Sequence, residues 1–243
     1  MTVNSLLRRA LFGLLFLASA GAAETNFSAR AELAFSNAQK QYLTNPADPA
    51  ILTAYARTAF DWAEFAKRDQ DRAHIAQEGI KAARRMIEIA PNSAAGHYYL
   101  GLNLGQLAQT KTLGALAILN EMVSAWEASA KIDPHYDYAG ANRSLGLLYF
   151  AAPGWPVSVG SKAKAAVHLE KAVALEPGYP DNQLCLMEAW LRWNQRGKLR
   201  ENLEKVAGIL AAARKTLTGE TWEESWILWD SRWQELQKAA KGK

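Results

Sequence analysis

The side chains able to do acid–base or metal chemistry are few and widely spaced in this sequence. Four histidines stand at positions 74, 97, 135 and 168, and no two of them have the spacing of metal ligands. Gly160-Ser161-Lys162 lacks the upstream glycine and the preceding strand of a phosphate-binding loop, and no Gly-x-Ser-x-Gly elbow occurs. We therefore expect no metal, no cofactor and no enzymatic activity.

Cys185 is the single cysteine, so the chain cannot form an internal disulfide. Its neighbours Leu184, Leu186 and Met187 are apolar, and a thiol in such surroundings is usually buried and unreactive. The alternative is a nucleophile that works with a distant histidine. An enzyme without a recognisable motif could use Cys185 and a histidine in this way.

The loop around Trp155 is the most unusual segment that could bind a ligand. It reads Ala-Pro-Gly-Trp-Pro over residues 152–156 and ends at Ser161, which can cap the next helix. Pro-Gly favours a turn, and Pro156 restricts Trp155 to an extended backbone. A stiff loop of this kind could present Trp155 as the wall of an apolar site, or it could fill a gap between two helices.

Helices must position these residues, because helical periodicity runs through the whole chain and strand-like alternation is almost absent. We expect helices over residues 27–44, 49–66, 70–89, 94–108, 112–131, 138–151, 162–175, 180–195, 198–214 and 222–239. Prolines punctuate them, with Pro91, Pro134 and Pro177 each 43 residues apart and Pro46 close to the same series. A fixed period of this size predicts a stack of helix pairs.

Small residues recur at matching places in the predicted units. Leu100-Gly101 and Leu145-Gly146 repeat one pair in the first helix of successive units. Glycine inside a helix costs about 1 kcal/mol relative to alanine, so its use there indicates close contact with a neighbouring helix.

The C-terminal segment predicts an amphipathic helix with a capping box at Thr221-x-x-Glu224. One face carries Trp222, Trp226, Trp229, Trp233 and Leu236. We expect a capping helix that lays these tryptophans on the last repeat, as repeat arrays require at their ends. A membrane-surface helix, a partner groove and self-association are the alternatives.

These patterns resemble the tetratricopeptide repeat (TPR). Leu145-Gly146-x-x-Tyr149 matches its first helix, and Ala165-x3-Leu169-x2-Ala172-x4-Pro177 matches its second, within a likeness that covers residues 46–214. The resemblance implies an all-α, TPR-like α-solenoid of about four extended helix pairs, flanked by an N-terminal helix and the Trp-rich C-terminal capping helix. The usual TPR period is about 34 residues. The extra residues lie at 106–115 and 152–161, and such insertions emerge on one face of a solenoid, often the binding face.

One group of TPR proteins is more similar. The run from Leu145 to Pro156, with its Tyr-Phe-Ala-Ala-Pro-Gly sequence and the Lys-Ala helix after Ser161, resembles the T-component family associated with tripartite ATP-independent periplasmic (TRAP) transporters. That resemblance implies a periplasmic protein that engages a solute-binding protein and offers it a hydrophobic ligand. It carries over Pro153, Gly154 and Trp155 as binding residues. Studied members resemble lipoproteins, whereas this chain has no cysteine to acylate at its cleavage site.

The first residues have the order of a secretory signal, with Arg8 and Arg9 before an apolar run at 10–18 and small residues at 18–23. We expect a signal peptide at 1–23, a repeat domain at 24–219 and a capping helix with its tail at 220–243. The mature protein would then be periplasmic and soluble. An uncleaved N-terminal anchor is the alternative.

Charge restricts the class of partner. The formal net charge is +4, and loss of Arg8 and Arg9 leaves +2, which is too small for a nucleic-acid binder. We therefore expect no nucleic acid. The partners expected from the repeat pattern are a protein and a small apolar ligand, and the aromatic, apolar-rich array could also form a homo-oligomer.

The repeat register predicts which side chains face the inner surface of the solenoid. They are Arg57, Tyr98, Leu102, Arg143, Leu147, Leu184 and Glu188. The leading hypothesis is a binding protein that holds a partner, with an apolar or carboxylate-bearing ligand, in a cavity lined by Tyr98, Arg143, Tyr149 and Trp155. Pro153 and Gly154 of the same loop are the remaining candidate binding residues. An arginine there could bind a carboxylate, or it could pair with an acidic residue of a neighbouring repeat. The rival functions are a structural module of an envelope or secretion complex, and an enzyme with a strongly perturbed titratable group in a cleft.

Overall fold

The computed structural model describes residues 21–111, 114–154 and 156–242. Over those residues the chain forms helices and no named strand; Gly154 and Gly160 make one isolated bridge. The helices are α2 (Gly21–Thr44), α3 (Pro49–Glu64), α4 (Asp69–Ile89), α5 (Ala94–Ala108), α6 (Ala115–Ile132), α7 (Tyr136–Ala151), α8 (Lys162–Leu175), α9 (Pro180–Arg192), α10 (Arg196–Ala213) and α11 (Glu220–Lys241). The predicted all-α fold is confirmed.

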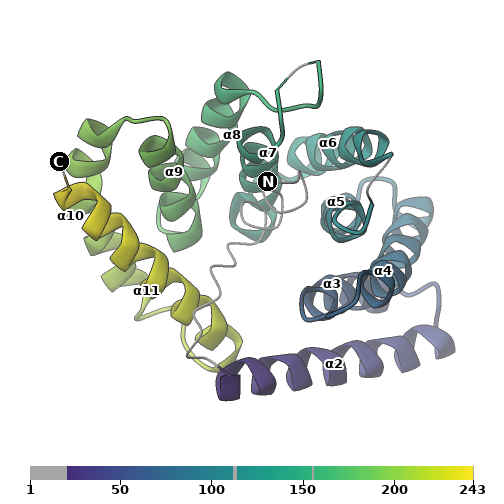
Figure 1. Cartoon of the computed structure of the whole chain (residues 1–243). Helices are drawn as coiled ribbons and strands as arrows, with labels where there is room; N and C mark the ends of the chain where they lie inside the picture. Colours follow the sequence, from purple (N-terminus) through teal and green to yellow (C-terminus); the bar gives the residue numbers. More distant parts are fainter. Residues whose placement is uncertain (1–20, 112–113, 155, 243) are drawn as a thin grey trace.

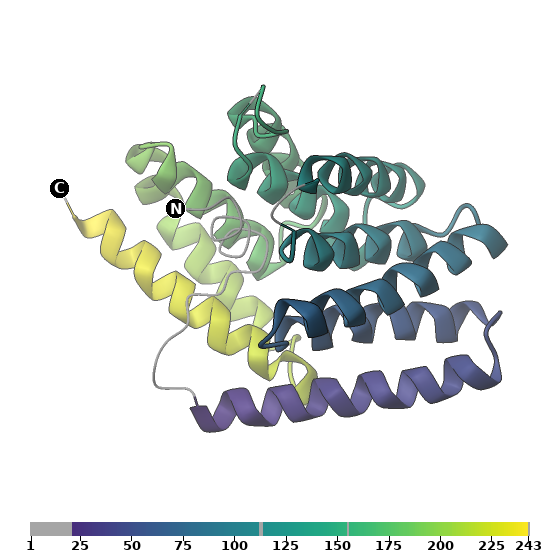
Figure 2. The same ribbon diagram turned by 45° about the vertical axis from the view of Figure 1, so that its right-hand side comes forward.

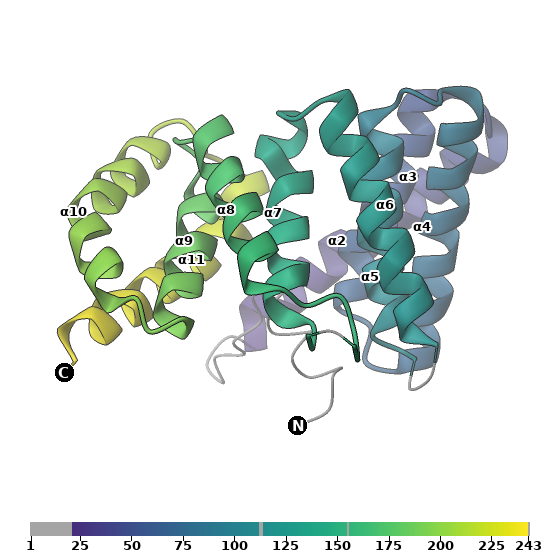
Figure 3. The ribbon, with the colours of Figure 1, turned by 90° about the horizontal axis from the view of Figure 1, so that it is seen from above.

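Consecutive helices pair and then stack in chain order. The pairs are α3–α4, α5–α6, α7–α8 and α9–α10, and the first helix of each pair also contacts the first helix of the next. Figure 1 shows α3, α5, α7 and α9 on the inner side of a curved array, with α4, α6, α8 and α10 outside. Seen from above, α5 to α10 stand side by side (Figure 3). The predicted solenoid of four helix pairs is confirmed.

Glycines allow the close approach that their positions predicted. A Cβ added at Gly101 of α5 would lie 2.3 Å from the indole nitrogen of Trp126 on α6. A Cβ at Gly146 of α7 would lie 2.6 Å from Cγ of Leu169 on α8. Trp126 and Leu169 are fully buried, so each glycine receives a large side chain of its partner helix.

The C-terminal helix α11 covers the last repeat as expected. Trp226, Trp229 and Leu236 are buried in one apolar cluster with Leu184 of α9 and Leu199 of α10. The predicted capping box is wrong: α11 begins at Glu220, its N-cap is Gly219, and no side chain caps it. Gly219 has a φ of 86°, which only glycine adopts without strain, so the chain turns two residues before Thr221.

Both flanking helices meet at their N-terminal ends (Figures 1 and 2). Arg30 of α2 lies 3.2 Å from Glu223 and 3.8 Å from Glu220 of α11. Two exposed ion pairs thus link the first described helix to the last. No helix of the described chain is both long and apolar enough to cross a membrane.

The first described helix begins inside the predicted signal peptide, and the boundary expected at residue 23 stays a prediction. Residues 1–20 of the predicted signal peptide lie outside the described residues, whereas residues 21–23 form the start of α2. The helix expected from 112 begins at Ala115, after Gly114 with its φ of 79°.

Candidate functional site

A strained turn opens α7 on the inner side of the array. Asp137, Tyr138 and Ala139 all have left-handed backbone angles, with φ between 50° and 60°. This conformation costs an L-residue roughly 1–2 kcal/mol. Three hydrogen bonds hold the turn. The Ala139 N–H donates to His135 O at 3.2 Å. The Tyr138 carbonyl accepts from the Arg143 guanidinium at 3.1 Å and from the side-chain amide of Asn182 at 3.0 Å. Strain of this kind persists where the surroundings over-determine it, and it clusters at binding sites.

Arg143 is the main support of the turn. Its Nη2 lies 3.1 Å from Asp137 Oδ2, its Nε lies 3.1 Å from Asp181 Oδ2, and its Nη1 donates to Asn182 Oδ1 at 3.0 Å. The guanidinium also lies 5.2 Å from the centre of the Tyr179 ring. Arg143 therefore pairs with an acidic residue of a neighbouring repeat, which was the second of the two interpretations given for it.

Asp181 extends this network to the last helix. Its second oxygen pairs with Arg232 of α11, whose Nε and Nη2 also bind both oxygens of Glu188 at 2.7 and 2.9 Å. Burial alone would raise the pKa of Asp181, but the charges of Arg232 and Arg143 outweigh it and lower the pKa below the usual value. The carboxylate therefore stays ionised between two arginines and links α7, α9 and α11.

Cys185 lies against this network and not in a purely apolar setting. Its Sγ is 3.3 Å from Nη2 of Arg232, and the thiol donates to Asp181 at 3.7 Å. Burial and the charge of Asp181 raise the pKa of the thiol. The side chain is buried, so the predicted inert state fits its surroundings.

An aromatic surface lies beside the network. Tyr138 is 37% exposed and stacks face to face on Tyr179 of α9, with ring centres 4.3 Å apart and planes 5° apart. Trp222 of α11 meets both rings edge-on, at 5.9 and 6.3 Å. We call Tyr138, Tyr179 and Trp222 the aromatic shelf. Tyr138 is the middle residue of the strained turn, so the turn fixes where its ring meets Tyr179 and Trp222.

Tyr98 joins Arg143 as the sequence predicted. Its hydroxyl donates to Asp137 Oδ2 at 2.6 Å, on the same carboxylate that Arg143 contacts. The Tyr98 side chain is 3% exposed and packs edge-on against Tyr99 and Tyr136. Tyr98 and Arg143 are therefore brought together as supports of the turn.

Tyr149 lies elsewhere on α7, about 9 Å further along the axis than Arg143. Its buried ring stacks on His168 of α8 at 5.6 Å, with the ammonium of Lys164 5.0 Å from its centre. The Tyr149 carbonyl accepts from Ser161 N–H at 2.9 Å, which ties the end of the α7–α8 loop to it.

The predicted loop residues belong with Tyr149. The carbonyl of Pro153 accepts from Gly160 N–H at 2.8 Å, and Gly154 bridges to Gly160. Trp155 lies outside the described residues. The structure thus separates the predicted site into two groups, with Tyr98 and Arg143 in one and Tyr149, Pro153 and Gly154 in the other. Their roles in binding stay predictions.

Acidic side chains gather on α3, near the start of α11. Desolvation, together with the charge of Glu224, raises the pKa of Asp61 to about 6 against the opposing charge of Arg57. Desolvation and the charges of Asp61 and Glu224 raise the pKa of Glu64 to about 8. Perturbed groups also occur in structural networks, and Glu64 accepts a hydrogen bond from Gln106 at 3.3 Å. Across the described part of the chain, no His, Cys, Asp and Glu side chains form a group of three that could hold a metal ion.

The sequence did not predict that Asp181 of α9 and Arg232 of α11 form one network. Asp181 and Arg232 are 51 residues apart, so no local pattern links them. The sequence feature that could have indicated this network is Arg232, an arginine beside the tryptophan face of α11. Leu184, expected on the inner surface, is fully buried in the C-terminal core, because α11 covers it.

Comparison with known proteins supports the architecture. The chain is similar to the crystal structure of a thermophilic TPR protein from Thermus thermophilus, with a TM-score of 0.59 and 17% identity, over 98% of this chain and 100% of that one. At this identity the likeness shows the fold alone. No protein-family model matches the chain, and no curated protein matches it. The all-α, TPR-like fold that the repeat pattern predicted is therefore confirmed.

Proposed function

We propose that this chain is a TPR-like scaffold that binds a partner protein on its inner face, with the aromatic shelf as the anchor point. The observation that carries this is the strained turn: three successive left-handed residues hold Tyr138 exposed and stacked on Tyr179. Rigid aromatic side chains of this kind dominate the binding energy of protein interfaces. The buried network beneath fixes the shelf before the partner arrives, which lowers the entropy lost on binding.

The partner would place an apolar or aromatic side chain on the shelf. A carboxylate is a poorer choice, since Arg143 already contacts Asp137, Asp181 and Asn182. A basic residue of the partner could approach Asp61 and Glu224, because each of these carboxylates has a raised pKa and an opposite charge would relieve their repulsion.

We further propose that the protein is exported and that it works with a TRAP-type solute transporter. The signal-like order of residues 1–23 supports export to the periplasm. The loop resemblance supports a solute-binding protein as the partner and a small apolar ligand. A structural module of an envelope or secretion complex is the alternative, and it would use the same fold without any ligand.

Photo-crosslinking from the shelf tests the proposal. A photoreactive phenylalanine analogue would replace Tyr138, and as a matched control Val167, which is 62% exposed on α8. The tagged proteins would be cross-linked in cells and recovered from the periplasmic fraction for mass spectrometry. We expect one dominant partner from position 138 and little from position 167.

The captured protein distinguishes the versions of the proposal. A solute-binding protein supports the transporter link, whereas envelope or secretion components support the assembly module. Equal capture from both positions contradicts the shelf as the binding surface. Absence of the protein from the periplasm contradicts export. Tyr138→Ala should weaken co-purification by roughly 30-fold, as for a hot-spot residue worth about 2 kcal/mol.

A further inference from the structure

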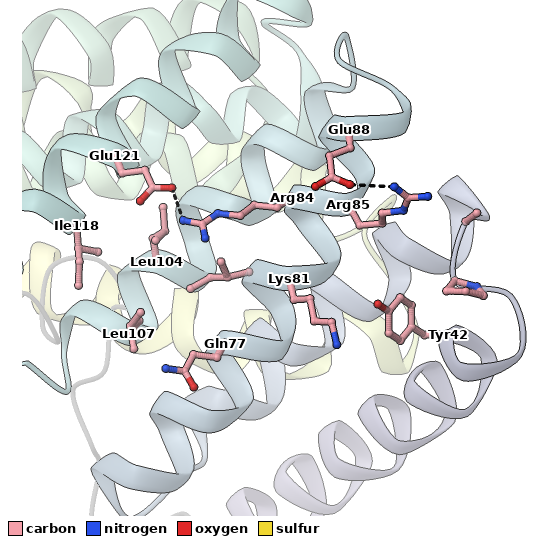
Figure 4. Close-up of a pocket in the computed structure, with 13 residues that line it drawn as sticks. Tyr42, Gln77, Lys81, Arg84, Arg85, Glu88, Leu104, Leu107, Ile118 and Glu121 are labelled. Carbon is pink, nitrogen blue, oxygen red and sulfur yellow. Dashed lines mark hydrogen bonds and ion pairs between the residues drawn. The ribbon is translucent and has the colours of Figure 1, made fainter.

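A second surface lies on the outer side of the array, away from the aromatic shelf. It is a groove of about 690 Å³ with α4 and α6 as its walls, α5 as its floor and the end of α2 at one edge (Figure 4). This volume is within the range of small-molecule sites, about 300–1,000 Å³.

The floor of the groove is aliphatic. Leu104 and Leu107 come from α5, Ile80 from α4 and Ile118 from α6. Leu104 and Ile80 are 2% and 6% exposed, while Leu107 and Ile118 are half-buried. A ligand lying on this floor would meet methyl groups along its length and polar groups only at the rim.

The cations of the rim are not equivalent. Arg84 reaches across the groove to Glu121 of α6 at 2.8 Å, and Arg85 pairs with Glu88 at 2.9 Å. Figure 4 shows Lys81 pointing toward Tyr42 instead, and its ammonium lies 5.9 Å from the centre of that ring. Within the described ranges no carboxylate lies within ion-pair distance of Lys81. The groove therefore offers one cation that an incoming anion could pair with.

The ion pair between Arg84 and Glu121 limits the size of the occupant. Beyond it lies a second hollow of about 430 Å³, which shares Arg84, Glu88 and Glu121 with the first and continues over Leu100 of α5. A helix with side chains is about 10 Å across, so it could lie along both hollows only if this ion pair opened. A single alkyl chain fits in the first hollow with the ion pair intact.

We propose that this groove binds an aliphatic monocarboxylate. Its carboxylate pairs with Lys81 near Tyr42, and its chain lies over Ile80, Leu104 and Leu107 toward Ile118. Glu121 limits the affinity, because it holds Arg84 away from the anion and adds a negative charge to the wall.

Methyl NMR of isoleucine-labelled protein, titrated with sodium dodecanoate below its micelle concentration, tests this proposal directly. Ile80 and Ile118 report on the groove. Ile227, which is 49% exposed on α11, reports on non-specific adsorption of an amphiphile. We expect saturable shifts at Ile80 and Ile118 with little change at Ile227. Octanoate should bind roughly tenfold more weakly, since it buries four fewer methylenes in a half-open groove.

Two substitutions test the charges in opposite directions. Lys81→Gln should weaken dodecanoate binding about fivefold, as for one exposed ion pair, and Glu121→Gln should strengthen it about threefold. Lys205→Gln on α10 is the matched control and should change nothing.

Four outcomes would overturn the proposal. They are shifts at Ile227 as large as those at Ile80, equal binding by the Lys81→Gln variant, equal binding of dodecyltrimethylammonium, and no saturable shift at all. Groove shifts with an acidic amphipathic peptide but not with dodecanoate would make the surface a protein-docking site instead.

Discussion

Asp181→Ala removes the carboxylate that two buried arginines share. Arg143 and Arg232 are 8% and 6% exposed, and the Asp181 side chain is 23% exposed. Removing one partner of a buried pair typically costs about 3–5 kcal/mol, because a charge is left without compensation. Here each arginine keeps another carboxylate, Asp137 for Arg143 and Glu188 for Arg232. We therefore expect a loss of about 2–3 kcal/mol in the free energy of unfolding.

Denaturation in urea, followed by circular dichroism, measures this loss. The control is Asp71→Ala, which removes a carboxylate 2.6 Å from Arg68 on side chains 40% and 76% exposed. Although this contact is shorter than the one between Asp181 and Arg143, an exposed ion pair contributes little to stability, because water and salt screen it. The reasoning fails if the two variants lose equal stability, since burial would then not set the strength of these pairs. Because the pKa of Asp181 is lowered in the folded state, its contribution should be present above about pH 4 and lost as the pH falls through the folded pKa.

Two further predictions concern packing and pH. Gly101→Ala should destabilise the protein by about 1–3 kcal/mol in the same assay, because the new methyl overlaps the Trp126 indole. Gly208→Ala on α10 is the control and should stabilise the protein by about 0.5–1 kcal/mol, because the space around it is open. Equal effects of the two substitutions would refute the close contact at Gly101. Glu64 binds its proton more tightly in the folded state, with a pKa of about 8, so stability should fall as the pH rises from about 4.5 to 8. Glu64→Gln should flatten the stability curve over that window and be more stable than the parent protein above about pH 8; an unchanged curve would contradict the raised pKa.

Local features of the fold were predictable from sequence. Prolines at a fixed spacing marked the ends of units, and Gly101 and Gly146 indicated where helices approach closely. These signals can be read from short stretches of sequence, because a proline ends the helix before it and a glycine inside a helix is costly unless another helix packs closely there. Ser161 was likewise expected to cap a helix, and its hydroxyl accepts from Lys164 N–H at 3.3 Å.

The candidate site was less predictable, for reasons that particular residues make clear. Arg143 was identified as an inner-face residue, but its partners depend on how α7 and α9 dock. Tyr-Asp-Tyr-Ala does not predict three left-handed residues in succession, because Asp137 is the one residue of the three whose type adopts this conformation with some frequency. The turn forms because tertiary contacts outweigh local preference. The capping box failed for a different reason, since Gly219 already starts the helix two residues before Thr221 could cap it.

The contact between Arg30 and Glu223 has a consequence for the number of repeats. In an open solenoid each unit touches only its neighbours, so units can be gained or lost without disturbing the rest. Here the first and last helices meet, and their separation is set by the summed rotation of the four pairs between them. Inserting or deleting one pair would carry Glu223 out of reach of Arg30. This contact is therefore compatible with four helix pairs, whereas a contact between neighbouring units of an open array is compatible with any number of units.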